Sequence, residues 1–256
     1  MSGRRLRWTA SIVLGLSLLG GASAYALTAE IGNTVVSSTA TMLPRELPAR
    51  GGAPISLSSI TRVKTKDNSP PGVLGSIDLM IDKHGYLETK GVPVCTAAKL
   101  ERTTPAQARK RCAGALVGTG TAKAEINLPG QPRMQMTSPI SFFNGPQLKG
   151  QPSLIAHAYE TVPAKKTLLV PIAIEKVNKG RYGYQVQVEI PEIAGGYGAP
   201  TLAEATVGRT FDRGGKKVGY LNAYCAGGRL QVQGDINFTN GDFFPATLTS
   251  PCHVPG

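Results

Sequence analysis

Apolar and polar side chains alternate with a period of two along most of this chain, from about residue 54 onward. In the clearest segment, 182–190, the apolar residues Tyr184, Val186, Val188 and Ile190 alternate with glutamine and glutamate. Successive side chains of a strand point to opposite faces of a sheet, so this pattern is typical of a strand with one buried face.

Similar segments recur at regular spacing, with short turns rich in Gly, Asn and Asp between many of them. Such spacing is typical of a β-sandwich or a jelly roll. We therefore predict a mainly β fold, with one β-sandwich or jelly-roll-like domain over residues 54–256. The other predicted strands are 55–64, 75–81, 115–128, 134–143, 153–161, 167–177, 205–211, 217–224, 229–238 and 243–249.

One segment, between Cys95 and Cys112, departs from this alternation. A threonine pair precedes Pro105, which suits the first position of a helix, and strong helix formers continue to Arg111. Residues 96–102 can add another turn. We expect a short helix held at both ends by the two cysteines.

The first 26 residues have the layout of a secretory signal peptide. A basic start at residues 4–7 precedes an apolar stretch over 9–21, and small residues offer cleavage sites near Ala24 or Ala26. An uncleaved anchor is the alternative, but the apolar stretch is shorter than the roughly 20 residues of a membrane-spanning helix. The sequence thus predicts a secreted or cell-envelope protein with no membrane span after cleavage.

The segment that follows, residues 27–53, shows little periodicity. Pro44 and Pro48 prevent a regular helix there. We predict a flexible tether or an irregular edge segment before the compact domain.

Four cysteines lie in the exported part: Cys95, Cys112, Cys225 and Cys252. An even number in an oxidising compartment indicates disulfides, and four cysteines allow three pairings. Local spacing favours Cys95–Cys112 and Cys225–Cys252. Zinc sites usually show closely spaced Cys or His pairs, which are missing here, so we expect no metal.

The chain is basic, with a formal net charge of +12. Loss of the three arginines of residues 1–26 leaves about +9. This balance favours an anionic cell-wall polymer or another glycan as the partner, with Arg109, Lys110 and Arg111 as the one tight cluster. A solvated basic surface is the plain alternative. No nucleic-acid-binding motif is present, and no nucleic acid is expected as a partner. The oligomeric state is left open.

Residues 91–95 and 112–120 contain the pattern Gly-x-Pro-x-Cys…Cys-x-x-Ala-Leu-Val-Gly-x-Gly. With these segments the chain resembles a family of exported actinobacterial proteins, and the resemblance spans most of the chain from about 54 to 252. The resemblance implies a secreted or envelope protein with a Cys-bounded helix on a β-rich body. It implies no activity, ligand or catalytic residue.

The search for catalytic residues gives none. No Gly-x-Ser-x-Gly elbow is present, and His157 lies in an apolar strand context where a structural histidine is the simpler interpretation. No dinucleotide or phosphate-loop motif is present, so no cofactor is expected. Tyr182 and Tyr184, two apart on a strand, are a candidate ligand face, although Tyr184 also suits the core. We therefore predict a non-catalytic extracellular or envelope protein with a binding or structural role. An extracellular carbohydrate-active or other hydrolytic enzyme is the alternative.

Overall fold

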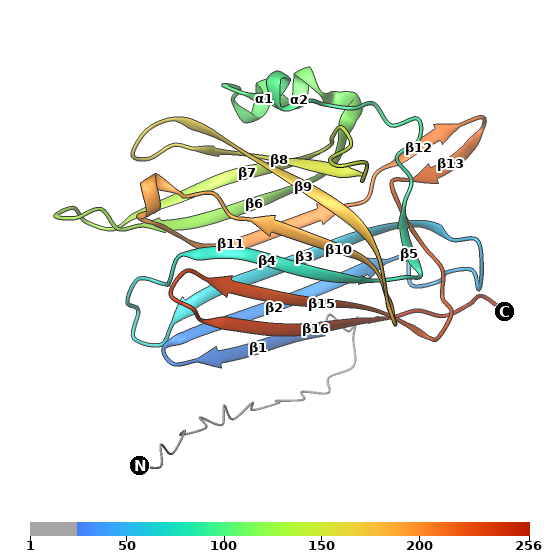
Figure 1. The fold of residues 1–256 in the computed structure, drawn as a ribbon, viewed down its shortest axis with the longest axis horizontal. Coiled ribbons are helices and arrows are strands. Elements are labelled where there is room, and N and C mark those ends of the chain that lie inside the picture. The colour runs from blue at the N-terminus through green and yellow to red at the C-terminus, as the bar shows by residue number, and fades with distance from the viewer. Residues whose placement is uncertain (1–24) are drawn as a thin grey trace, which may run out of the picture.

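The computed structural model describes residues 25–256, and most of its strands form one large antiparallel sheet (Figure 1). The strand order is β1-β2-β3-β11-β6-β7-β8-β9-β10-β4-β15-β16. The first and last strands of this order, β1 and β16, lie against each other, so the sheet is nearly closed into a barrel. The predicted mainly β fold is thereby confirmed, and its two layers belong to one continuous, curved sheet.

The elements have the following bounds. The strands are β1 Tyr25–Ile31, β2 Thr34–Leu43, β3 Ala53–Thr65, β4 Leu74–Asp82, β5 Gly85–Leu87, β6 Leu116–Ile126, β7 Met134–Asn144, β8 Ser153–Glu160, β9 Lys166–Lys179, β10 Tyr182–Glu189, β11 Gly198–Val207, β12 Thr210–Arg213, β13 Lys216–Gly219, β14 Leu221–Ala223, β15 Arg229–Phe238 and β16 Phe243–Pro251. The helices are α1 Ala97–Leu100 and α2 Pro105–Arg111, with 3-10 turns η1 Ala113–Ala115 and η2 Ala194–Gly196. β12 and β13 form a separate hairpin, while β14 joins β3 to β5.

The segment 27–53 differs from the predicted tether or irregular edge. It contains most of β1 and all of β2, and these strands form one end of the sheet order. Ser and Thr hide this strand pattern because a small hydroxyl residue fits either face of a sheet. Ser38, for example, is buried, and its hydroxyl forms a hydrogen bond with the Thr61 hydroxyl at 3.0 Å.

The predicted signal peptide falls almost wholly in residues 1–24, outside the described part of the chain. The two proposed cleavage sites differ in their effect on the fold. Because β1 begins at Tyr25, cleavage after Ala24 leaves this strand whole, whereas cleavage after Ala26 removes its first two residues.

Two disulfides join Cys95 to Cys112 and Cys225 to Cys252, as the local spacing favoured. The second lies in an apolar cluster with Met42, Leu47 and Leu230. The first joins the two ends of the segment that contains α1 and α2, so the predicted disulfide-bounded helix is also confirmed. Within residues 25–256, no helix is long and apolar enough to cross a membrane.

Candidate functional site: a basic pocket beside the helical cap

The segment from Cys95 to Ala115, here called the helical cap, covers the outer face of β7 and β8. Leu100, Ala108 and the Cys95–Cys112 disulfide pack on Phe143 and Ile155 of these strands. A capping box begins α2. The Thr104 hydroxyl accepts from the Gln107 amide nitrogen at 3.4 Å, and the Gln107 side chain accepts from the Thr104 amide nitrogen at 2.9 Å. Burial, capping and the disulfide together fix the cap on the sheet.

Thr103, in the connection between α1 and α2, anchors the cap to the sheet. Its side chain is fully buried, and its hydroxyl donates to the Leu100 carbonyl. Its own carbonyl accepts from the Thr167 hydroxyl at 2.9 Å and lies 3.1 Å from Nε2 of His157. His157 on β8 and Thr167 on β9 therefore hold the connection in place.

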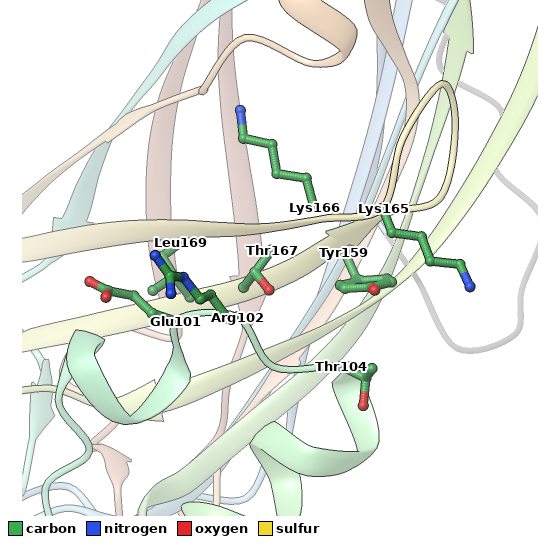
Figure 2. A pocket seen from close by; sticks show the side chains of 8 residues that line it. All are labelled: Glu101, Arg102, Thr104, Tyr159, Lys165, Lys166, Thr167 and Leu169. Carbon is green, nitrogen blue, oxygen red and sulfur yellow. The ribbon is translucent and has the colours of Figure 1, made fainter.

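A hollow of about 500 Å³ lies where this connection passes over the β8–β9 turn. Figure 2 shows Thr167 and Tyr159 on the strands, with the α1–α2 connection and its charged side chains beside them. This hollow, here called the basic pocket, is lined by Glu101, Arg102, Thr104, Tyr159, Lys165, Lys166, Thr167 and Leu169.

The cations of the basic pocket are free to meet a ligand. Arg102, Lys165 and Lys166 are exposed, and within the described residues none of them takes part in an ion pair or side-chain hydrogen bond. By contrast, Arg181 and Arg209 are used inside the fold. Arg181 pairs with Asp82 at 2.8 Å, and Arg209 donates to three carbonyl oxygens beside η1.

The predicted cluster Arg109, Lys110 and Arg111 forms the last turn of α2 and is exposed. Arg111 donates to the Lys99 carbonyl at 3.3 Å, which ties α2 to α1. Cations at a helix C-terminus also interact favourably with the helix dipole, so part of this cluster is explained by local stability. The cluster nevertheless lies on the same cap as the basic pocket.

Glu101 is the one acidic residue of the helical cap and of the pocket lining, against seven cations of the cap and the pocket. These are Lys99, Arg102, Arg109, Lys110, Arg111, Lys165 and Lys166. Glu160, at the end of β8, lies opposite Lys166 in the sheet register, but it is buried and accepts from the Ala194 amide nitrogen at 2.7 Å. Arg102, Lys165 and Lys166 were not among the site residues predicted from the sequence. Their only signal was the Lys-Lys pair in the turn before residues 167–177, and nothing local placed that turn beside the cap.

The contacts of His157 are those of a histidine with a structural role. Both Thr103 oxygens act as acceptors toward Nε2, so we assign the hydrogen to Nε2, while Nδ1 is buried without a partner. Burial lowers the pKa of His157 below its ordinary value of 6.5, and the charge of Arg109 lowers it further. A triad histidine needs an acid at its second nitrogen, and Nδ1 has none here.

The two candidate tyrosines do not share a face. A bulge shifts the register at Gly183, so that Tyr182 pairs with Asp82 while Tyr184 pairs with the adjacent Ile81. Neighbours on a strand point to opposite sides, which places Tyr182 outside and Tyr184 inside. A Cβ at Gly183 would lie 2.8 Å from Cα of Lys83, so this bulge requires glycine.

Tyr184 packs in the apolar cluster of Ile174 and Val186, and burial raises the pKa of its phenol. Tyr182 accepts a hydrogen bond from Gln231 at 2.9 Å on the outer face. The bulge, which simple alternation does not predict, thus divides the candidate ligand face between the two sides of the sheet.

Among the acidic residues, Asp78 of β4 lies directly opposite Asp235 of β15 on the outer face. Burial raises the pKa of Asp235, and the charge of Asp78 raises it further. Asp78 accepts a hydrogen bond from Asn237 at 2.9 Å.

The turn at 82–85 is organised by Asp82. This buried carboxylate accepts from Nε of Arg181 at 2.8 Å and from the Gln231 amide at 3.1 Å, and Nδ1 of His84 lies 2.7 Å away. Its oxygens are thus occupied by N–H donors. No group of three or more His, Cys, Asp or Glu side chains in residues 25–256 is arranged to hold a metal ion.

No protein-family model matches this sequence, and no curated protein matches it. The resemblance to exported actinobacterial proteins therefore stays a prediction.

Proposed function

We propose that the mature chain is an exported, non-catalytic binding protein whose partner is an anionic polymer of the cell envelope. The contact surface is the basic pocket together with the exposed last turn of α2. The resemblance and the basic charge support this setting, and the two disulfides suit an oxidising compartment.

The observation that carries the proposal is the set of unpaired cations on a rigid support. A disulfide, a capping box and the buried Thr103–His157 contact hold the backbone of the cap on the sheet, so the backbone positions that carry Arg102 and the last turn of α2 are fixed before a partner binds. Unpaired like charges repel one another, and a polyanion relieves this repulsion. A polymer can span the distance between the pocket and α2, whereas a small anion would meet only part of the surface.

The proposal is tested by the binding of the mature, oxidised protein to a purified phosphodiester-linked wall polymer across a salt series. The test variant, here called the pocket variant, carries Arg102→Gln, Lys165→Gln and Lys166→Gln. A matched control loses three exposed cations elsewhere, with Lys123→Gln, Lys216→Gln and Lys217→Gln.

Exposed ion pairs each contribute about 0.2–1 kcal/mol, so loss of three should weaken binding about 3- to 150-fold. We expect salt-sensitive binding of the polymer that the pocket variant loses and the control variant keeps. An equal loss of affinity in both variants would mean that the polymer responds only to the overall positive charge, and it would refute the proposed site. Salt-resistant binding to a neutral glycan would favour a different ligand face.

One observation favours a second candidate function, that of a hydrolytic enzyme. Glycoside hydrolysis uses a carboxylate pair in which one member stays protonated more readily than the other. Asp78 and Asp235 lie opposite each other, and the pKa of Asp235 is raised. Hydrolysis of glycan substrates that is abolished by Asp78→Asn and by Asp235→Asn would support this candidate, and activity unchanged in both variants would exclude this pair.

A further inference from the structure

The basic pocket contains one negative charge, that of Glu101. Glu101 and Arg102 follow directly after α1, and both line the hollow together with Lys165 and Lys166 at the β8–β9 turn. All four side chains are exposed. A ligand that enters the hollow therefore meets a carboxylate as well as three cations.

Glu101 does not pair with the cations around it. Within residues 25–256, its carboxylate takes part in no ion pair. Other acidic residues of the surface do pair, such as Glu30 with Lys66 at 2.8 Å and Glu88 with Arg213 at 3.1 Å. An acid that served only to offset the neighbouring cations would gain most by direct contact with them. The hollow thus presents its negative and positive charges separately.

The backbone at the rim of the hollow has an unusual conformation. Glu101 is extended, with φ −55° and ψ 140°, whereas Arg102 has a φ of +54°. This left-handed region is uncommon for residues other than glycine, asparagine and aspartate. The next residue, Thr103, is fully buried, and its carbonyl accepts from the Thr167 hydroxyl, which holds this geometry on the sheet. In Figure 2, Glu101 and Arg102 lie at one end of the hollow and Lys165 lies at the other.

The hollow has room for more than one charged group. Its volume of about 500 Å³ lies within the range of pockets that hold small molecules. Tyr159 and Leu169 add an aromatic ring and an apolar side chain to the lining, and both suit the carbon skeleton of a sugar or a polyol. A phosphate alone would satisfy the cations but would leave Glu101 facing a like charge. A unit that carries both a phosphate and an ammonium group would satisfy the whole lining.

We infer that the basic pocket recognises a repeating unit that carries an ammonium group beside its phosphate. The phosphate contacts Arg102, Lys165 and Lys166, and the ammonium group contacts Glu101. The inference rests on the proposed function, since it names the class of polymer that this site prefers: a phosphodiester polymer substituted with primary amines. An aminoacyl ester and an amino sugar are the two sources of such a group.

The test compares three forms of poly(glycerol phosphate) of equal length: unsubstituted, with alanyl esters, and with glucosaminyl substituents. The affinity of the mature, oxidised protein for each form is measured at constant ionic strength. The readout is the ratio of the affinity for each amine-bearing form to the affinity for the unsubstituted form. Amines reduce the net charge of the polymer, so nonspecific attraction lowers this ratio to the same extent in every variant.

Glu101→Gln removes the negative charge and keeps the size of the side chain. One exposed ion pair corresponds to about 1.5- to 5-fold in affinity, so the ratio should fall by this factor in the variant. Its affinity for the unsubstituted form should rise, because a charge of the same sign as the polymer has been removed. The substituent whose ratio depends on Glu101 identifies the source of the amine.

Glu189→Gln is the matched control for this variant. Glu189 is also exposed, but it lies at the end of β10 and is not part of the lining of the hollow. Its replacement changes the net charge of the protein by the same amount as Glu101→Gln. We expect Glu189→Gln to keep the ratio of the wild type for both amine-bearing forms.

The inference is overturned if Glu101→Gln leaves both ratios unchanged, or if Glu189→Gln lowers them equally, since the carboxylate then acts only through the net charge. The proposed function has a different failure. It is refuted if the pocket variant and its lysine control lose affinity for the unsubstituted polymer equally, whatever the effect of Glu101→Gln on the ratio. Absence of binding to all three forms would overturn both proposals.

Discussion

The buried His157 predicts a specific loss of stability in mild acid. Its side chain is fully buried, its Nδ1 has no partner, and burial lowers its pKa below 6.5. Above pH 6.5 this histidine is neutral in both the folded and the unfolded chain, so it contributes little pH dependence. Below pH 6.5 the unfolded chain binds a proton that the folded chain does not. The free energy of unfolding therefore decreases as the pH is lowered.

The magnitude follows from proton linkage. The slope approaches about 1.4 kcal/mol per pH unit between 6.5 and the lower pKa of the folded state. Integrated from pH 6.5 to 5.5, the loss reaches at most about 1 kcal/mol, which for a domain of this size corresponds to a Tm shift of roughly 2–4 °C. Above pH 6.5 the corresponding change is much smaller.

The measurement is urea unfolding at pH 7.5, 6.5 and 5.5 for the wild type and for His157→Gln. Glutamine keeps a donor for the Thr103 carbonyl but does not titrate, so the difference between the two curves isolates the histidine. The wild type should lose up to about 1 kcal/mol more than the variant between pH 6.5 and 5.5. Parallel curves, or a wild type that gains stability relative to the variant in acid, would refute a buried neutral His157.

Further predictions concern the cap, the bulge and the acidic pair. Replacing both Cys95 and Cys112 by alanine opens a loop with a sequence separation of 17 and should lower the free energy of unfolding by about 3 kcal/mol in urea titrations. An effect below 0.5 kcal/mol would show that packing alone holds the cap. Gly183→Ala forces a Cβ to 2.8 Å from Cα of Lys83 and should cost about 1–3 kcal/mol, whereas Gly227→Ala, at an exposed bend with open space and no positive φ, should cost less. Asp235→Asn removes the repulsion from Asp78 and should stabilise the fold by about 0.2–1 kcal/mol at pH 7. Because the pKa of Asp235 is raised, its carboxyl is more readily protonated in the folded state, so this gain should disappear as the pH falls toward 4 and an unchanged gain would contradict the assignment.

Local sequence patterns predicted most elements because each depends on residues that are neighbours in the chain. The alternation over 182–190 corresponds to β10, and the Thr-Thr-Pro segment corresponds to the capped start of α2. Local patterns failed where the type of a residue does not show which face of its strand it occupies. Ser and Thr in β2 concealed a strand, and the single glycine of the bulge reversed the side of Tyr182 relative to Tyr184.

The strand order, by contrast, needed information that no segment contains. β4 lies between β10 and β15, so residues 74–82 pair with residues that follow them by 100 or more positions in the chain. The turns predict which strands form hairpins, but they do not predict which hairpins become neighbours. The nearly closed ring is therefore a property of the structure alone.

The basic pocket illustrates the same point at the scale of a site. Arg102 and the pair Lys165–Lys166 lie more than 60 residues apart in sequence. They become neighbours because the Thr103 carbonyl accepts from Thr167, directly after those lysines, and lies 3.1 Å from Nε2 of His157. A change at Thr103 should therefore weaken polymer binding without removing a charge. Thr103→Val keeps the shape but loses the hydroxyl bonds to Leu100 and His157. If it leaves polymer affinity unchanged while lowering stability, the cations act as a dispersed surface and their fixed arrangement is irrelevant.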